Sequence, residues 1–344
     1  MSKIDLRSDT VTLPTSEMMD AINNAQLGDD VYVEDTPTLE LESLAAKITG
    51  KESALLVSSG TMGNLICNLV HAPRGTEVIM GNKSHTFLYE SGGISSYGGI
   101  HSHQLKNNDD GSIDINEIKN AIRIDDVHFP RTSLICLENT HNKCHGFPLE
   151  LNYINSVCDV AHDNNIKVHM DGARLFNACA ALDITADQIL SNVDSVTFCL
   201  SKGLSAPIGS VICGTHDFIS EARRIRKSLG GGMRQTGIIS AAGIISLTSM
   251  INRLKDDHKN AQTLAHGIAN LKGIVLNTDL VPTNIIYFNF NHQDMTSADL
   301  VSHMESNDII FSDYNGKHCR LVLHNGITGH DVEKVIDVFN KLLS

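Results

Sequence analysis

Short apolar segments alternate with amphipathic segments along most of the chain. The apolar segments are continuous runs, which is typical of strands buried on both faces, and the amphipathic ones have the spacing of helices that cover such a sheet. This alternation predicts a mainly parallel sheet with helical crossovers. The predicted strands are Ser53–Ser59, Glu77–Met80, Ser133–Glu138, Lys167–Met170, Ser195–Leu200 and Ile208–Cys213, and the predicted helices include Leu39–Thr49, Asn116–Ile122, Ile154–Asn164 and Arg174–Leu182.

The pattern changes after Ala241. A long helix is predicted to reach Leu271, followed by the strand Asn284–Phe290, the helix Ala298–Ser306, the strand Cys319–His324 and the helix Asp331–Leu342. This order predicts a smaller α+β domain after a large α/β domain. We therefore expect a polar N-terminal arm over residues 1–15, a large domain over 16–245 and a small domain over 246–344. The arm is expected to pack on another part of the molecule or on a partner subunit.

Composition and charge narrow the function classes. The 344 residues hold 27 Lys and Arg against 40 Asp and Glu, a net charge of −13, which disfavours nucleic acid and anionic membranes as main partners. The longest uncharged stretch, Gln235–Asn252, is broken by hydroxyl side chains and is predicted to be a buried helix. The N-terminus lacks the apolar segment of a secretory signal, and eight widely spaced cysteines without a CxxC pair indicate reduced thiols, so we expect a cytosolic protein.

Several common catalytic motifs are missing from the chain. There is no GxGxxG after the first strand, no GxxxxGK[ST], no HExxH and no GxSxG. The spacing of His101 and His103 suits metal ligands, but two histidines alone make a poor site, so a surface or edge position is the better interpretation and no metal is expected.

Two short motifs carry the strongest chemical signal. Asp171 in HMDGAR and Lys202 in CLSKGL are 31 residues apart, and each follows a predicted strand. Ligands of doubly wound sheets bind at the carboxyl ends of the strands, so both side chains can face one crevice. A lysine beside such an apolar strand is costly to bury unless it is neutral or paired. A Schiff base to pyridoxal phosphate, with the Asp at the ring nitrogen, removes that cost. An ordinary Asp–Lys salt bridge is the simpler alternative.

Three further features favour the cofactor interpretation. The segment Ser58–Asn64 follows a strand and opens a helix, so its amides can hold a phosphate, although a plain N-cap looks the same. His85, beyond the next strand, can stack on a flat cofactor or act as a base, although a lone loop histidine is usually a surface residue. Arg174 can reach a phenolic oxygen or a carboxylate.

The residues then become recognisable as a set. The segments IDLRSDTVTLP, GDDVY, SSGTMGN, ENTHN, HMDGARLFNA, CLSKGLSAPIGS and GGGMRQTG occur in order. Together they closely resemble the low-specificity L-threonine aldolases, which are fold-type-I enzymes that depend on pyridoxal 5'-phosphate. The resemblance implies an α/β fold with a mainly parallel seven-stranded sheet and a smaller C-terminal α+β domain, and an oligomer, a homodimer or homotetramer, with sites at the interface.

The resemblance also assigns roles to single positions. Lys202 would bind the cofactor covalently, Asp171 would pair with the pyridine nitrogen, and His85 would stack on the ring. The remaining assignments are Gly60 and Thr61 to the phosphate, Ser8, Arg174 and Arg320 to the substrate carboxylate, Arg174 also to the cofactor, His128 to the substrate hydroxyl from a neighbouring subunit, and Lys227 and Arg234 to a site across the dimer interface. Without the resemblance, Lys227 and Arg234 would be read as helix-capping charges around a turn.

The implied reaction is cleavage of the Cα–Cβ bond of threonine or allo-threonine to glycine and an aldehyde, with His85 or His128, directly or through water, as the base. Two departures from the family pattern affect the expected contacts: VEDTPT after GDDVY, and Met62 where many members carry a polar residue. Another pyridoxal phosphate lyase, which would release pyruvate and ammonia, and a non-catalytic scaffold are the alternatives.

Overall fold

A seven-stranded sheet forms the larger part of the molecule. The computed structural model describes residues 3–314 and 316–344. The sheet has the order β2-β8-β7-β6-β5-β3-β4, and only β8 runs against the others. This confirms the predicted mainly parallel seven-stranded sheet. The strands are β2 Ser53–Val57, β3 Glu77–Gly81, β4 His101–Leu105, β5 Thr132–Glu138, β6 Lys167–Asp171, β7 Ser195–Cys199 and β8 Ser210–Gly214.

Helices cover both faces of this sheet, which explains why its strands are apolar on both sides. One face packs against α2 Thr36–Thr49, α6 Ile115–Ala121, α7 Leu151–Asp163, α8 Leu175–Leu182 and α9 Ala186–Ile189. The other face packs against α3 Gly60–His71, α5 Gly93–Ser96 and α10 His216–Ser228. Each predicted strand and helix of this part is present, with ends shifted by a few residues. The helices α1 Ser16–Asn23 and α4 His85–Leu88 complete it.

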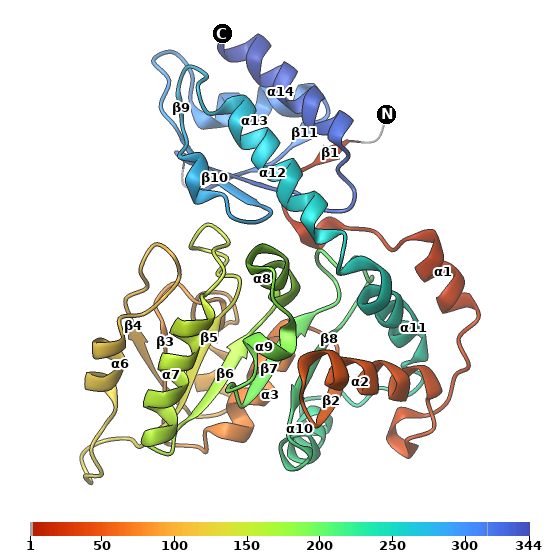
Figure 1. The fold of residues 1–344 in the computed structure, drawn as a ribbon, viewed down its shortest axis with the longest axis vertical. Coiled ribbons are helices and arrows are strands. Elements are labelled where there is room, and N and C mark those ends of the chain that lie inside the picture. Colours follow the sequence, from red (N-terminus) through yellow and green to blue (C-terminus); the bar gives the residue numbers. More distant parts are fainter. Residues whose placement is uncertain (1–2, 315) are drawn as a thin grey trace.

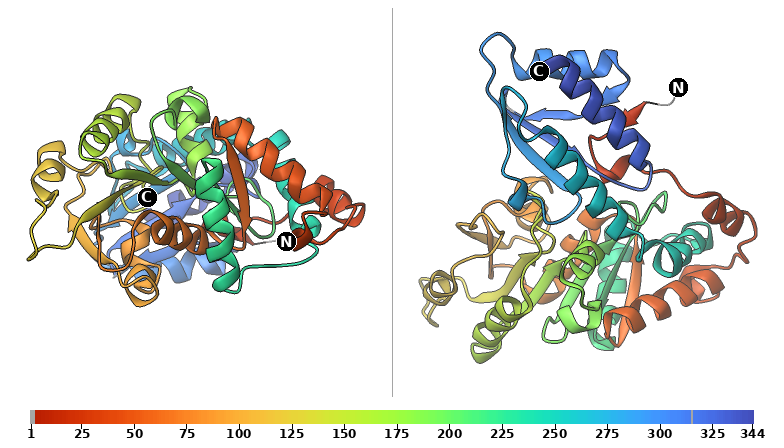
Figure 2. Two further views of the ribbon diagram at one scale, coloured as in Figure 1. Left: turned by 90° about the horizontal axis from the view of Figure 1, so that it is seen from below. Right: turned by 45° about the horizontal axis from the view of Figure 1, so that its top comes forward.

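A second, four-stranded antiparallel sheet is formed by the C-terminal part, in the order β12-β13-β10-β9. It lies beyond one end of the large sheet, with α12 and α14 side by side on it (Figure 1; Figure 2). The N-terminal strand β1 pairs with β11, so the start of the chain packs on the C-terminal part. The elements are β1 Ile4–Asp5, β9 Ile274–Val275, β10 Ile285–Phe290, α13 Ser297–Ser306, β11 Ile309–Ile310, β12 Ser312–Tyr314, β13 His318–Val322 and α14 Gly329–Leu343.

The long helix expected from Ala241 to Leu271 is wrong. The chain instead forms α11 (Gly237–Ile245), a π-helical turn (Ser246–Met250) and α12 (Leu254–Ile268), and the two halves bend by 66°. The hydroxyl of Ser246 donates to the carbonyl oxygens of Ala242 and Leu204, and that of Thr248 donates to Ile244. The bend itself lies at residues 251–253, a turn between the π-helical segment and α12. The predicted domain limit at 245/246 lies at the start of the π-helical segment, ahead of this bend, and stays a prediction.

No single helix of the described ranges is long and apolar enough to cross a membrane. The bent pair of α11 with its π turn and α12 meets the length and composition criteria only when its two halves are taken together.

His101 and His103 lie on β4, the edge strand of the large sheet. His103 Nδ1 is 3.1 Å and His101 Nε2 is 3.6 Å from the carboxylate of Glu77, which is fully buried. Arg123 supplies a cation to the same carboxylate at 3.3 Å. This edge position explains the HSH pattern as part of an ion-pair cluster.

The core of the small sheet depends on Phe339 of α14, whose buried ring lies 6.3 Å from Phe288 and 6.1 Å from Phe311 between ring centroids. Phe339→Ala should lower the free energy of unfolding by about 3–5 kcal/mol, because it removes buried area and leaves a cavity. Urea denaturation followed by circular dichroism measures this change. The exposed neighbour Lys341→Ala is the control, and equal unfolding midpoints for the two variants would contradict the prediction.

Candidate active site

The predicted residues Asp171, His85 and Lys202 and the helix start at Gly60 lie at the carboxyl ends of the parallel strands, where ligands of doubly wound sheets bind. Glu138 ends β5, Asp171 ends β6, and the two are directly paired in register. His85 begins α4 just after β3, and Lys202 follows β7 by three residues. The start of α3, which follows β2, lies at the same edge because β2 runs parallel to β7 through the antiparallel β8.

Asp171 is a buried carboxylate held on both oxygens. The backbone N–H of Ala173 donates to Oδ1 at 3.1 Å, and Asn64 Nδ2 of α3 donates to Oδ2 at 2.9 Å. Its residue surface is only 4% exposed, yet no ion pair of Asp171 is formed within residues 3–314 and 316–344. A buried carboxylate is costly without a charged partner, so this position favours a ligand that brings a positively charged N–H.

A second buried carboxylate, Glu90, lies beside it. Asn64 Nδ2 also donates to Glu90 Oε1 at 2.9 Å, and His85 Nδ1 is 2.8 Å from the same oxygen. Facing ligand atoms of His85, Glu90 and Asp171 all lie within 4.8 Å of one another, a spacing that would also suit a metal ion. The hydrogens of Asn64 and His85 already occupy the facing oxygens, so the group forms a hydrogen-bonded cluster in this structure.

The cluster changes the proton affinity of its members. Burial alone would lower the pKa of His85, but the hydrogen bond to Glu90 and the charge of Asp171 outweigh it and raise that pKa. Burial raises the pKa of Glu90, and the nearby Asp171 adds to this against the bond from His85. With Nδ1 committed to Glu90, the Nε2 atom of His85 is the one that can exchange a proton with a ligand.

The start of α3 suits an anion. Ser59 caps the helix by accepting from the Met62 amide, and the amides of Gly60 and Thr61 precede the first intrahelical acceptor, so they can donate to a ligand. A Cβ atom at Gly60 would lie 3.0 Å from the sulfur of Cys199, so glycine lets the helix start approach the end of β7. Lys202, three residues after Cys199, is partly buried, and its carbonyl oxygen accepts from Thr12 of the N-terminal arm at 2.9 Å.

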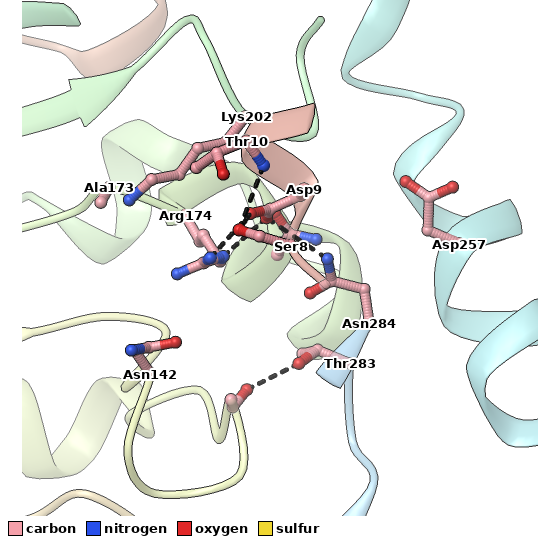
Figure 3. A network of polar contacts seen from close by, with 12 residues as sticks. Ser8, Asp9, Thr10, Asn142, Ala173, Arg174, Lys202, Asp257, Thr283 and Asn284 are labelled. Carbon is pink, nitrogen blue, oxygen red and sulfur yellow. Dashed lines mark hydrogen bonds and ion pairs between the residues drawn. The ribbon is translucent and has the colours of Figure 1, made fainter. Parts of the chain in front are cut away.

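Arg174 is fixed by a residue that sequence reasoning missed. Its Nε and Nη2 atoms each donate to the carboxylate of Asp9 at 2.7 Å, and both residues are buried. Figure 3 shows the two side chains pointing toward one another, with Asn284 of the C-terminal part approaching Asp9 at 3.4 Å. Burial would raise the pKa of Asp9, but the charges and hydrogen bonds of Arg174, with Lys202 and Arg320 nearby, lower it well below its usual value. The arm thereby links the two sheets.

Arg320 of β13 reaches the same region from the small sheet. Its Nη2 atom donates to the side-chain oxygen Oδ1 of Asn142 at 2.9 Å. The backbone N–H of Asn142 donates in turn to Glu138 Oε1 at 2.8 Å. The other oxygen of Glu138 accepts from the His85 amide at 2.6 Å. Among the described residues the buried Nε–H of Arg320 has no acceptor, which suits a carboxylate ligand.

The remaining predicted positions are placed differently. Ser8 is partly buried, and its Oγ accepts from the Thr10 amide, so it caps the short turn that presents Asp9. His128, with 81% of its side chain exposed, lies on a loop and pairs with Asp126. Lys227 is exposed, and Arg234 pairs with Asp29. Within one chain these last three are not brought to the cluster, so their assignment to a neighbouring subunit's site stays a prediction.

Sequence reasoning missed the residues that hold the recognised ones in place. Asn64, Glu90, Glu138 and Asn142 each orient a predicted site residue through hydrogen bonds of 2.6–2.9 Å. Asn64 lies inside the segment SSGTMGN, and Glu138 and Asn142 lie inside ENTHN, both already noted as motifs. A polar residue on the apolar face of a helix, as Asn64 is on α3, is the signal that could have pointed to one of them.

The chain is similar to known proteins over most of its length. A sequence profile described as "Beta-eliminating lyase" matches residues 5–291. The chain is 45% identical to a probable low-specificity L-threonine aldolase 2 of Arabidopsis thaliana, over 98% of this chain and 97% of the relative. It is 38% identical to the low specificity L-threonine aldolase of Escherichia coli K12, over 96% and 97%. The solved structure of a Leishmania major threonine aldolase superposes with a TM-score of 0.82 at 17% identity, over 99% and 100%.

The pair of Asp9 and Arg174 makes a prediction about pH. Asp9→Asn should lower the free energy of unfolding at pH 7 by about 3–5 kcal/mol, because it leaves the guanidinium of Arg174 buried without its anion. Since the pKa of Asp9 is lowered in the folded state, its contribution is complete above about pH 4, near the usual pKa of an unfolded Asp, and is lost as the pH falls toward the folded value.

Urea denaturation between pH 7 and pH 3 measures this dependence. The wild-type protein should lose more stability between pH 4.5 and pH 3 than Asp9→Asn does. The control is Asp183→Asn, since Asp183 forms an exposed ion pair with Lys255. Parallel curves for the wild type and Asp9→Asn would show that this carboxylate does not stabilise the fold through Arg174.

Proposed function

The chain belongs to the beta-eliminating lyase family, and on that premise we propose that it cleaves the Cα–Cβ bond of L-threonine, L-allo-threonine and related β-hydroxy-α-amino acids, with pyridoxal 5'-phosphate as cofactor, to glycine and an aldehyde. The observation that carries this proposal is the buried carboxylate of Asp171, held by Asn64 and the Ala173 amide beside His85. The threonine aldolases to which the chain is similar supply the reaction.

The residues present fit this cofactor part by part. Asp171 would accept the hydrogen bond of a protonated pyridine nitrogen and so gain the positive partner that it lacks among the described residues. The free amides of Gly60 and Thr61 would hold the phosphate. Lys202 offers its amine for covalent attachment, and the flat ring of His85 lies within reach of Asp171. The bound cofactor supplies an electron sink for the pair of electrons released when the Cα–Cβ bond breaks.

The protein's own residues orient the substrate and move protons. The unsatisfied Nε–H of Arg320 and the hydroxyl of Ser8 would hold the substrate carboxylate. Asp9 accepts from the Nε–H and from one Nη2–H of Arg174, so the second Nη2–H and the two Nη1–H donors are left for the substrate or cofactor. Placing the Cα–Cβ bond correctly favours its cleavage over loss of the Cα proton or the carboxylate.

His85 is positioned to take the proton of the β-hydroxyl group. Its Nδ1 atom is hydrogen-bonded to Glu90 and its backbone amide donates to Glu138, so Nε2 is the ring nitrogen left to exchange a proton with a ligand. His128 of a second copy, directly or through water, is the other base that the resemblance implies. Either histidine would hold the proton at a ring nitrogen until it is returned.

Replacement of the lysine tests the assignment of the cofactor site. Lys202→Ala should reduce the release of acetaldehyde from L-threonine by about 10³-fold or more, because covalent attachment and its amine are lost together. A coupled alcohol dehydrogenase assay measures acetaldehyde, and Lys255→Ala, an exposed lysine on α12, is the control. Threonine cleavage by Lys202→Ala at the wild-type rate would show that Lys202 is not the attachment site. Release of pyruvate and ammonia by the wild type would favour a β-eliminating lyase instead.

We further propose that two copies of the chain complete each site, in a cytoplasmic homodimer or homotetramer. His128, Lys227 and Arg234 are exposed in the single chain, where His128 pairs with Asp126 and Arg234 with Asp29. Large apolar side chains in the N-terminal segment are also exposed, as expected of an interface: Leu13, Leu27, Val31, Tyr32 and Val33.

Mixing two inactive variants tests the shared site. Lys202→Ala and His128→Ala, each inactive alone, should regain about a quarter of the wild-type activity when they are unfolded and refolded together, since half the dimers are hybrids with one intact site. Acetaldehyde release measures this recovery. The control mixes Lys202→Ala with Asp171→Ala, two residues of one chain's site, which should recover nothing. Equal results for both mixtures would contradict a contribution of His128 across the interface.

A further inference from the structure

A chain of buried hydrogen bonds continues behind Asp171 into the interior of the large sheet. His169 and Asp171 lie two residues apart on β6, so both side chains project from the same face. Ser195 of β7 is paired in register with His169. Asn64 of α3 lies over this face and contacts both β6 residues. The exposed fractions are 0% for His169 and Ser195 and 1% for Asn64, so these three residues are shielded from solvent.

The direction of each hydrogen bond follows from the two carboxylates. The Nδ2 atom of Asn64 donates one hydrogen to Glu90 and the other to Asp171. The side-chain oxygen Oδ1, which can only accept a hydrogen bond, therefore faces His169. Its neighbour at 3.2 Å is His169 Nε2, which must therefore carry a hydrogen. Burial lowers the pKa of His169 to about 3, so the ring is neutral and its Nδ1 atom accepts. The donor to Nδ1 is the hydroxyl of Ser195 at 3.0 Å.

The chain ends at a second histidine. His71, the last residue of α3, is partly buried, and its Nε2 atom is 2.9 Å from Ser195 Oγ. Since the Ser195 hydrogen is used toward His169, His71 donates to Ser195. Its ring stacks on Phe218 at 4.6 Å between centroids, which fixes its orientation. Each donor in the chain thus points toward Asp171 and Glu90.

This polarity fixes the orientation of one amide. If the amide of Asn64 were turned over, its oxygen would face the two carboxylates and its NH₂ group would face the N–H of His169. Both contacts would be repulsive in a buried site where polar groups are strongly coupled. The two carboxylates and the Nε2–H of His169 therefore favour the same orientation of Asn64, the one that donates to Asp171.

We propose that His169 is a positioning residue for the cofactor: its Nε2–H holds Asn64 in the orientation that fixes Asp171 as the acceptor for the ring N–H of pyridoxal phosphate. This inference rests on the proposed function only in so far as that cofactor binds. His169 acts through Asn64 and Asp171, so its effect is confined to the ring nitrogen. The phosphate and Lys202 are held by other residues.

The test compares two cofactors that differ only at that atom. Apoenzyme is titrated with pyridoxal phosphate and with its deaza analogue, which has a carbon in place of the ring nitrogen, and both dissociation constants are measured by fluorescence. The readout is the ratio of the two affinities, which does not depend on turnover. General damage to the site would weaken both cofactors alike and leave this ratio unchanged.

Two substitutions of His169 give opposite expectations. His169→Leu fills the space without a donor and should lower the preference for the natural cofactor by about tenfold, the effect of one lost hydrogen bond to a charged group. His169→Gln places an amide N–H near the position of Nε2 and should keep the preference within about threefold of the wild type. His258→Leu is the matched control. It removes another largely enclosed histidine, one that contacts Asn177 on α8, and should leave the ratio unchanged.

Specific results would overturn the proposal. If His169→Leu has the same ratio of cofactor affinities as the wild type, His169 is only a packing residue. If the Leu and Gln variants lower this ratio equally, the hydrogen bond of His169 is not the cause. If His169→Leu fails to fold, Asn64→Ala removes the same bond to Asp171 and must lower the ratio at least as far. Wild-type protein that binds neither cofactor would overturn the proposed function, and this inference with it.

Discussion

Two carboxylates, Asp171 and Glu90, are buried at one edge of the large sheet, and much of the surrounding structure satisfies them. Removing two anions from water is costly, and two like charges in contact raise that cost. The amide of Asn64 donates to both, the Ala173 amide donates to Asp171, and His85 binds Glu90. One positive partner is still missing at Asp171 within the described residues, and a protonated pyridine nitrogen supplies it. The cofactor site is therefore a place where the fold leaves a charge to be completed by a ligand.

A second buried anion serves a different purpose. Asp9 comes from the N-terminal arm, contacts Arg174 of the large sheet and approaches Asn284 of the small one. The resemblance implied that Arg174 binds the substrate carboxylate or the cofactor, and two of its five N–H donors already hold Asp9. The chain has a net charge of −13, yet Arg174, Lys202 and Arg320 all lie near Asp9. The carboxylate of Asp9 neutralises one of these three positive charges, and the other two are left for incoming anions.

The sequence predicted the large sheet and the residues at its strand ends, because these depend on local patterns. Continuous apolar runs identify buried strands, and a polar residue after such a run, as Asp171 and Lys202 are, marks the ligand edge. The residues that orient them could not be found in this way. Asn64, Glu90 and Asp9 come from three separate segments, and only the folded chain shows that they meet His85, Asp171 and Arg174. The single helix expected from Ala241 to Leu271 is broken by the turn at residues 251–253, which the apolar periodicity of the sequence does not reveal.

The proposed activity requires that the cofactor binds at Lys202 and that the site recognises glycine as a product. The visible absorption spectrum of the purified protein, recorded before and after addition of glycine, tests both at once. We predict a coloured protein whose absorption band is lost in Lys202→Ala, and a new band at longer wavelength when glycine is added to the wild type. A protein that stays colourless after incubation with pyridoxal phosphate, or a spectrum that glycine does not change, would contradict the account.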